Sequence, residues 1–261
     1  MSRNHPGDNK LWQLPRKTMK KFIFIISAGR SGSTLLQAIL NAHDNVLIRG
    51  ENNNFFYYTM LAHQSLLRSN GRQTPKPGPS SPWYGFSNYD EKSFCSEIRS
   101  LGIKYMLGEY EMDQVEYLGF KEIRYFDFLE SQAYGNKIPL LTDSKLHGRR
   151  KLFSLILFLN KVFNPATFVV LERSSEEICN SAWWNNPDKY TKSILMEDIE
   201  NFYDVTKEIL TNQSLDFHSI NYESLRKRNH NSIENLFKAI GIKYDKYLSK
   251  KVLNTRLNHC E

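Results

Sequence analysis

Short apolar runs and stretches with helical spacing alternate along most of this chain. The apolar runs predict strands, and they cover 22–26, 117–120, 139–141, 167–171 and 217–220. Apolar residues recur at helical spacing over 33–43, about 150–162, 175–184, 193–212 and 231–240. Strands that alternate with helices favour a parallel sheet with helices on both faces. The pattern therefore predicts an α/β fold.

The length of 261 residues suits one large domain. Residues 1–19 are polar and contain two prolines, so we expect a flexible lead-in to a domain over 20–261. Residues 69–88 hold four of the nine prolines. A loop of this length inside a compact domain usually has a function or is disordered. Its aromatic residues Trp83, Tyr84 and Phe86 favour the first alternative, a lid that covers a binding site.

The strand at 22–26 runs into Ser-Ala-Gly-Arg-Ser-Gly-Ser-Thr at 27–34, and a helical pattern follows. Gly29 and Gly32 let the backbone come close to a ligand, and loop N–H groups with the helix N-terminus attract an anion. Arg30 adds a charged, bidentate group. The segment therefore predicts a site for a phosphate-bearing ligand. It is not the P-loop motif of nucleotide hydrolases, because that motif has lysine where Ser33 follows Gly32.

A second anion signal follows the strand at 167–171. Arg173 stands at the end of that strand, where open α/β sheets bind their ligands. Ser174 and Glu177 match a helix capping pair, which predicts that Ser181 lies two turns along the next helix. Arg173 and Ser181 could together hold a second phosphate. Two phosphate sites on one sheet predict a nucleotide that carries phosphates on its 5′ and 3′ sides.

At these two segments the chain resembles the PAPS-dependent sulfotransferases, closest in style to the bacterial carbohydrate and tyrosylprotein types. Residues 29–36 look like their 5′-phosphosulfate loop, P-R-S-G-T-T-x-L, and residues 171–181 look like their 3′-phosphate motif. The chain departs at Ala28 and Gly29, where a proline usually precedes the arginine, and at Ser33, where threonine is commoner.

The resemblance implies a single-domain, P-loop-like sulfotransferase fold with a parallel sheet flanked by helices. It implies 3′-phosphoadenylyl sulfate (PAPS) as the sulfuryl donor, adenosine 3′,5′-bisphosphate as the product and no metal. The residues that it assigns to donor binding are Gly29, Arg30, Ser31, Gly32, Ser33, Thr34, Arg173, Ser181 and Tyr222. The rival hypotheses are a P-loop-type small-molecule kinase and a non-catalytic nucleotide- or glycan-binding module on the same fold.

Sulfuryl transfer requires a base for the acceptor hydroxyl. Glu51 is our candidate, because related enzymes have a glutamate about this far after the loop in an A-H-P-x-V…G-E context. Here that context reads Ala-His-Asp-Asn-Val at 42–46 and Gly50-Glu51. The alternative base is His43, since cytosolic sulfotransferases use a histidine that sits elsewhere in their chains.

Cations must also meet the charge that develops on the leaving phosphate. Arg30 is the candidate on the 5′-phosphate side, and Lys145 is the candidate for the bridging oxygen. Lys121 and Arg124 are rivals of Lys145, because they too follow a strand.

Aromatic residues supply further candidates. Tyr222 is our candidate for the adenine face, although a core position at a strand end suits it equally. Trp183 and Trp184 either line an acceptor channel or pack in the interior. The glutamate-type base and the tryptophans favour a carbohydrate or glycolipid hydroxyl as acceptor, with peptide tyrosine and small alcohols or phenols left open.

The formal net charge of +7 favours an anionic partner. The basic residues are scattered and no nucleic-acid-binding motif is visible, so we expect no nucleic acid partner, while a peripheral membrane contact stays compatible with the charge. Cys95, Cys179 and Cys260 are odd in number and far apart, which predicts free thiols. With no signal peptide and no membrane-spanning stretch visible, a cytoplasmic location is the expectation. The oligomeric state is left open.

Overall fold

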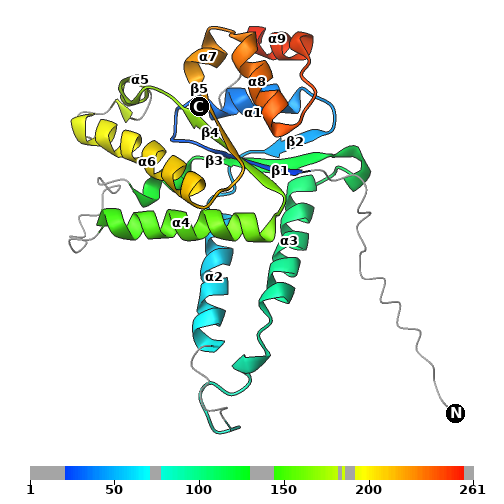
Figure 1. Ribbon diagram of the computed structural model, residues 1–261, viewed down its shortest axis with the longest axis vertical. Coiled ribbons are helices and arrows are strands. Elements are labelled where there is room, and N and C mark those ends of the chain that lie inside the picture. The colour runs from blue at the N-terminus through cyan, green and yellow to red at the C-terminus, as the bar shows by residue number, and fades with distance from the viewer. Residues whose placement is uncertain (1–20, 71–77, 130–143, 182–183, 186–191, 256–261) are drawn as a thin grey trace, which may run out of the picture.

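The computed structural model describes residues 21–70, 78–129, 144–181, 184–185 and 192–255, except for the side chains of 144–146. Within these residues, the strands form one parallel sheet in the order β2-β3-β1-β4-β5 (Figure 1). The strands are β1 (Lys21–Ile26), β2 (Val46–Arg49), β3 (Tyr117–Glu122), β4 (Ala166–Glu172) and β5 (Phe217–Asn221). All their carboxyl ends therefore meet at one edge of the sheet.

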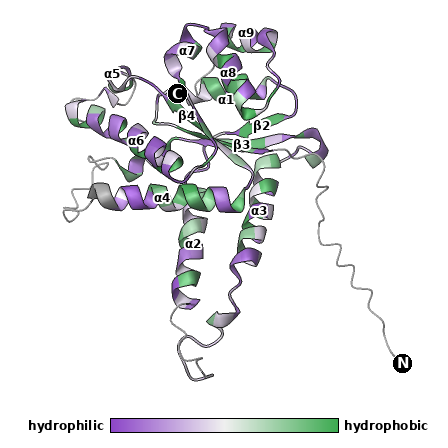
Figure 2. Cartoon of the chain, viewed as in Figure 1, coloured by the Kyte–Doolittle hydropathy of each residue, from purple (hydrophilic) through white to green (hydrophobic). Residues whose placement is uncertain are grey.

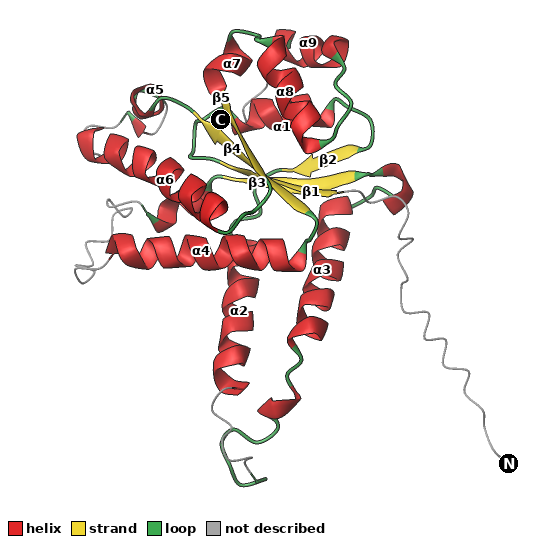
Figure 3. Cartoon of the chain, in the orientation of Figure 1, coloured by secondary structure: helices red, strands yellow, loops and turns green. Residues whose placement is uncertain are grey.

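Helices cover both faces of the sheet, as Figure 3 shows. The α-helices are α1 (Ser33–Asn41), α2 (Phe55–Asn70), α3 (Glu91–Leu107), α4 (Ser144–Val162), α5 (Ser175–Cys179), α6 (Lys192–Asn212), α7 (Tyr222–Arg226), α8 (His230–Ile240) and α9 (Lys246–Asn254). The short 3₁₀ helices are η1 (Phe86–Asn88), η2 (Met112–Gln114) and η3 (Arg124–Phe128). None of the described helices is long and apolar enough to cross a membrane.

The core has two halves, one on each face of the sheet. Alternate residues of β1 belong to different halves: Phe22 and Phe24 pack toward α2, α3, α4 and α6, whereas Ile23 and Ile25 pack toward α1 and α8. A strand buried on both faces reads as a continuous apolar run, which is why β1 was visible in the sequence. Figure 2 shows hydrophilic stretches on the outer helices α6 and α7.

The α/β fold with a parallel sheet is confirmed, and four of the five expected strands are present. The expected strand at 139–141 lies outside the described residues. Strand β2 and the helices α2 and α3 were not expected. Helix α3 contains Gly102, a residue with low helix propensity. The missing side chain lets Phe163 pack against the helix, because a Cβ at Gly102 would lie 2.6 Å from the Phe163 ring. The N-cap of α3 was a usable signal, because Asp90 accepts hydrogen bonds from the N–H groups of Lys92 and Ser93.

Helices α2 and α3 form a hairpin that projects from the sheet, and residues 78–88 lie at its far end (Figure 1). The expected lid segment 69–88 thus includes the end of α2, the turn before η1 and η1 itself, with 71–77 outside the described residues. Its role as a lid stays a prediction. The expected lead-in at 1–19 also lies outside the described residues.

Candidate active site

The loop over 27–32, called the anion loop below because the sequence predicts that it binds an anion, joins the carboxyl end of β1 to the start of α1. Arg30 has φ 63° and Gly32 has φ 89°, so the chain turns through left-handed conformations before the helix begins. Ser27 and Ser31 are fully buried, and their hydroxyls have no hydrogen-bond partner among the described residues. Buried hydroxyls are rarely left unpaired. The loop therefore offers unused polar groups where an anion would bind.

Residues from two further strand ends close around this loop. Tyr222 begins α7 directly after β5, and a Cβ on Gly32 would lie 2.2 Å from its ring. Arg173 follows β4, where its Nη1 donates to the carbonyl oxygen of Arg30 at 2.7 Å. The guanidinium carbon of Arg173 lies 4.5 Å from the centroid of the Tyr222 ring. The structure thus brings the two predicted anion-binding segments together.

Arg173 has a carboxylate partner on α5. Its Nε donates to Oε2 of Glu177 at 3.1 Å, and Arg226 on α7 donates to the other oxygen at 3.2 Å. The expected capping pair is wrong, because Ser174 makes no side-chain cap and Glu177 is held by the two arginines instead. The glutamate therefore orients Arg173 rather than the start of the helix.

Ser181 does not lie on a helix as expected, because α5 ends at Cys179. The N–H of Ser181 donates to the carbonyl oxygen of Ile178 at 3.0 Å, and its hydroxyl donates to the same oxygen at 2.8 Å. These bonds tighten the chain into a turn that ends the helix early. Ser181 remains eight residues after Arg173 but on this turn, half-buried.

Glu51 and Lys121 form an ion pair at the carboxyl edge of the sheet. Nζ of Lys121 lies 2.6 Å from Oε1 of Glu51, and the side chains are 8% and 32% exposed, respectively. Lys121 lies on β3 opposite Ile25 of β1, two residues before the anion loop begins at Ser27. The structure therefore places the rival lysine beside both the candidate base and the loop. Lys145 stands in the first turn of α4, and its side chain lies outside the described residues.

Two acidic residues that the sequence reasoning missed surround this pair. Glu122 is fully buried at the end of β3 and accepts hydrogen bonds from backbone N–H groups, including that of Arg124. Asp127 lies in η3 with an exposed side chain, yet the protein groups around its carboxyl group partly desolvate it and raise its pKa to about 6. Arg124 lowers that pKa, whereas the charges of Glu122 and Glu51 raise it.

His43 lies at the opposite end of α1 from the anion loop. Its Nδ1 bonds the carbonyl oxygen of Ile39 at 2.9 Å, and its Nε2 accepts from the N–H of Asp245 at 3.0 Å. The ring is buried and lies 4.3 Å from that of Phe237, centroid to centroid. Both ring nitrogens are engaged in holding α1 to the last helices, which argues against His43 as the base.

Trp184 is 3% exposed, and its ring makes an edge contact with Phe126 at 5.7 Å between centroids. Trp184 therefore packs in the interior, which was the second of the two positions considered from the sequence. Trp183 lies outside the described residues. Among the residues that the structure describes, no group of three or more His, Cys, Asp or Glu side chains could hold a metal ion.

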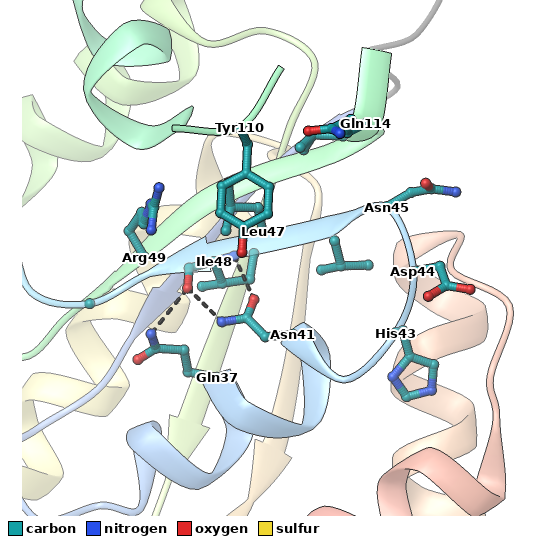
Figure 4. Close-up of a pocket in the computed structure, with 13 residues that line it drawn as sticks. Gln37, Asn41, His43, Asp44, Asn45, Leu47, Ile48, Arg49, Tyr110 and Gln114 are labelled. Carbon is teal, nitrogen blue, oxygen red and sulfur yellow. Dashed lines mark hydrogen bonds between the residues drawn. The ribbon is translucent and has the colours of Figure 1, made fainter. Parts of the chain in front are cut away.

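A groove of about 760 Å³ runs along the free edge of β2, beside the anion loop's helix rather than over the loop (Figure 4). Amide side chains, acidic and basic groups and Tyr110 line it: Gln37, Asn41, His43, Asp44, Asn45, Arg49, Tyr110 and Gln114. Asn41 accepts from the N–H of Ile48 at 2.7 Å, and Asn41 and Gln37 donate to its carbonyl oxygen at 2.9 and 3.0 Å. The lining extends to Gly50, the residue before Glu51.

The chain is similar to known sulfotransferases. A model of the sulfotransferase family matches residues 23–246. Among solved structures, the sulfotransferase domain of the Synechococcus PCC 7002 olefin synthase is 16% identical, with 92% of this chain and 80% of that chain covered and a TM-score of 0.47. The sulfotransferase domain from the curacin biosynthetic pathway is 15% identical, with 88% and 77% covered and a TM-score of 0.49.

A sulfotransferase from Alicyclobacillus acidocaldarius is 10% identical, with 90% of this chain and 85% of that chain covered and a TM-score of 0.41. No curated protein matches the chain. The assignment rests on the family model, which spans both anion-binding segments, the Glu51–Lys121 pair and all five strands except the first two residues of β1. On that match, the chain belongs to the sulfotransferase family.

Proposed function

We propose that this protein transfers the sulfuryl group of PAPS to a hydroxyl group of a carbohydrate or glycolipid acceptor. The observation that carries the proposal is a pair of buried hydroxyls, those of Ser27 and Ser31, which find no partner within the described part of the chain and lie in a loop that Arg173 and Tyr222 close. Unused buried donors beside a helix N-terminus and an arginine suit a phosphate-bearing ligand.

The donor supplies an activated sulfuryl group together with a phosphate leaving group. We assign its 5′ side to the loop residues Gly29, Arg30, Ser31, Gly32, Ser33 and Thr34, and its 3′-phosphate to Arg173 and Ser181. Tyr222 contributes by holding the guanidinium of Arg173 over its ring and by packing against Gly32. This arrangement keeps the arginine next to the loop before any ligand arrives.

The Glu51–Lys121 pair supplies the proton chemistry. Glu51 is partly exposed and takes the proton of the acceptor hydroxyl, whose oxygen then forms the new bond to sulfur. The bond between sulfur and the bridging oxygen breaks, and the leaving phosphate keeps that oxygen with its electron pair. Lys121, buried beside Glu51, meets the charge that develops there. Lys121 thus takes the role for which Lys145 was the first candidate.

Thermal shift measurements test the donor site. Adenosine 3′,5′-bisphosphate should raise the Tm more than 5′-AMP does, because only the bisphosphate engages both anion sites. Arg173→Ala should erase most of that difference while a response to AMP remains. Equal stabilisation of the wild-type protein by the two nucleotides would mean that the 3′-phosphate site is misassigned.

The groove along β2 supports a carbohydrate acceptor. Exposed polar side chains such as those of Asp44 and Asn45 can pair with sugar hydroxyls, and Tyr110, which is 51% exposed, offers an aromatic surface against which a sugar can pack. The lining of the groove includes Gly50, the residue before Glu51 in the chain, and our proposal is that an acceptor with several sugar units occupies the groove while one hydroxyl reaches the base. Mass spectrometry of the products from PAPS and a panel of oligosaccharides, glycolipids, tyrosine peptides and phenols would identify the acceptor class.

Tyr110→Ala should raise the KM of an oligosaccharide acceptor by about tenfold, because a lost aromatic contact of 1–1.5 kcal/mol corresponds to roughly that factor. The kcat and the KM of PAPS should hardly change. Tyr247→Ala is a suitable control, since Tyr247 is 75% exposed on α9 and does not line the groove. An unchanged acceptor KM in Tyr110→Ala would exclude this groove as the acceptor site.

A further inference from the structure

Glu122 links the carboxyl end of β3 to the chain segment that carries Glu51. Its Oε2 accepts hydrogen bonds from the backbone N–H groups of Asn52 at 3.0 Å and Asn54 at 3.3 Å. Those two residues lie between β2 and α2, directly after Glu51. Hydrogen bonds from N–H groups to an ionised carboxylate are stronger than those to a neutral acceptor. The side chain of Glu122 therefore ties this segment to β3.

The other oxygen of Glu122 fastens the exit of its own strand. Oε1 accepts from the backbone N–H groups of Ile123 at 3.0 Å and Arg124 at 3.1 Å. Within the described part of the chain, its bonds go to backbone N–H groups and no ion pair joins it to a cation. One fully buried side chain thus holds two chain segments at the edge of the sheet.

The segment after Glu51 has a backbone conformation that requires such support. Asn53 and Asn54 have φ values of 52° and 62°, in the left-handed region. Asparagine tolerates this region better than most residues but still at some cost, and such conformations persist when their surroundings hold them. Removal of the acceptor from two N–H groups here should let the segment relax.

Lys121 and Glu122 are adjacent on β3, and both bind the segment that contains Glu51. Lys121 binds the carboxylate of Glu51, while Glu122 binds the backbone that follows it. We propose that Glu122 is a positioning residue that fixes Glu51 for proton transfer. This inference rests on the proposed function, in which Glu51 is the base.

The test compares Glu122→Gln with Glu122→Asp. Glutamine keeps the size, but its amide nitrogen cannot accept from the N–H groups that it faces. We expect kcat to fall on the order of 10²-fold, the effect of a misplacement of about 1 Å. The KM of PAPS should stay within about twofold, because the donor contacts are untouched. Glu122→Asp, which keeps the charge, should recover part of kcat, and it serves alone if the glutamine variant does not fold.

Amide hydrogen exchange gives a second readout that needs no acceptor. The N–H groups of Asn52 and Asn54 should exchange faster in Glu122→Gln than in the wild type. Asp216→Asn is the control, because the Asp216 carboxylate accepts hydrogen bonds from Lys21 and Thr167 at the amino edge of the parallel sheet, opposite the site. This control should lower the Tm while kcat and the exchange of the two asparagine amides stay unchanged.

Two results would overturn the inference alone: normal kcat in a folded Glu122→Gln beside an impaired Glu51→Gln, or unchanged amide exchange at Asn52 and Asn54. Normal turnover of Glu51→Gln beside an impaired Glu122→Gln would instead overturn the assignment of the base, and the positioning role with it. The comparison of these variants therefore separates a failure of the inference from a failure of the proposed function.

Discussion

Glu51 has the two features that a general base needs: its carboxylate is partly exposed, and a buried lysine fixes its position. Glu51→Gln keeps the size and the hydrogen-bonding reach but cannot take a proton at neutral pH. Turnover of an aliphatic hydroxyl acceptor should fall about 10²–10⁴-fold, the usual contribution of general-base catalysis, while the affinity for adenosine 3′,5′-bisphosphate changes little. Steady-state kinetics and calorimetry of the bisphosphate measure the two quantities.

His43→Asn tests the alternative base and is compared with Glu51→Gln. Both ring nitrogens of His43 bond within the protein, so its loss should lower the Tm with little effect on kcat. An inactive His43→Asn beside a near-normal Glu51→Gln would make the histidine the base after all and would weaken the case for a sugar acceptor.

At the scale of elements, the anion loop depends on the close contact between Gly32 and Tyr222. Any side chain at Gly32 would have to keep φ near 89°, which costs about 1–2 kcal/mol, and its Cβ would lie 2.2 Å from the tyrosine ring. Gly32→Ala should therefore lower the Tm and displace Tyr222 and the arginine above it, so that stabilisation by adenosine 3′,5′-bisphosphate is lost. Gly78→Ala, where a Cβ meets no atom within 4 Å, should change neither.

The sequence was informative where the chemistry is local. The anion loop and its helix could be recognised because strand, glycines, Arg30 and apolar spacing follow one another within twenty residues. The position of Lys121 beside Glu51 could not be predicted from the sequence, since it depends on β3 lying next to β1 in the sheet. The role of Glu122 was hidden for the same reason, because its partners are backbone groups 68 and 70 positions away.

At the scale of the whole molecule, Asp127 should make global stability depend on pH. The pKa of its carboxyl group is about 6 in the folded protein, against an ordinary value of 3.8. The native state therefore holds this proton more tightly than the unfolded state does. The resulting stabilisation is complete below about pH 4 and is lost as the pH rises through about 6.

Asp127→Asn removes this titration. The Tm of the variant should rise relative to that of the wild type between pH 4 and pH 7, because only the wild type acquires over that range a charge that the folded protein disfavours. Thermal unfolding followed in steps of one pH unit measures the difference. Parallel Tm curves for the two proteins would contradict the assignment of the raised pKa to Asp127.

The hydrogen bonds from Asn41 and Gln37 to the backbone of Ile48 have a consequence for aggregation at high protein concentration. The outer strand of an open sheet is a template on which a strand of another chain can add, the first step toward aggregation. At β2 the outward N–H and carbonyl groups of Ile48 are already saturated by side chains of the protein's own helix. A strand from another chain would have to break these three hydrogen bonds before it could pair with Ile48. The edge strand β2 should therefore resist strand addition at this residue.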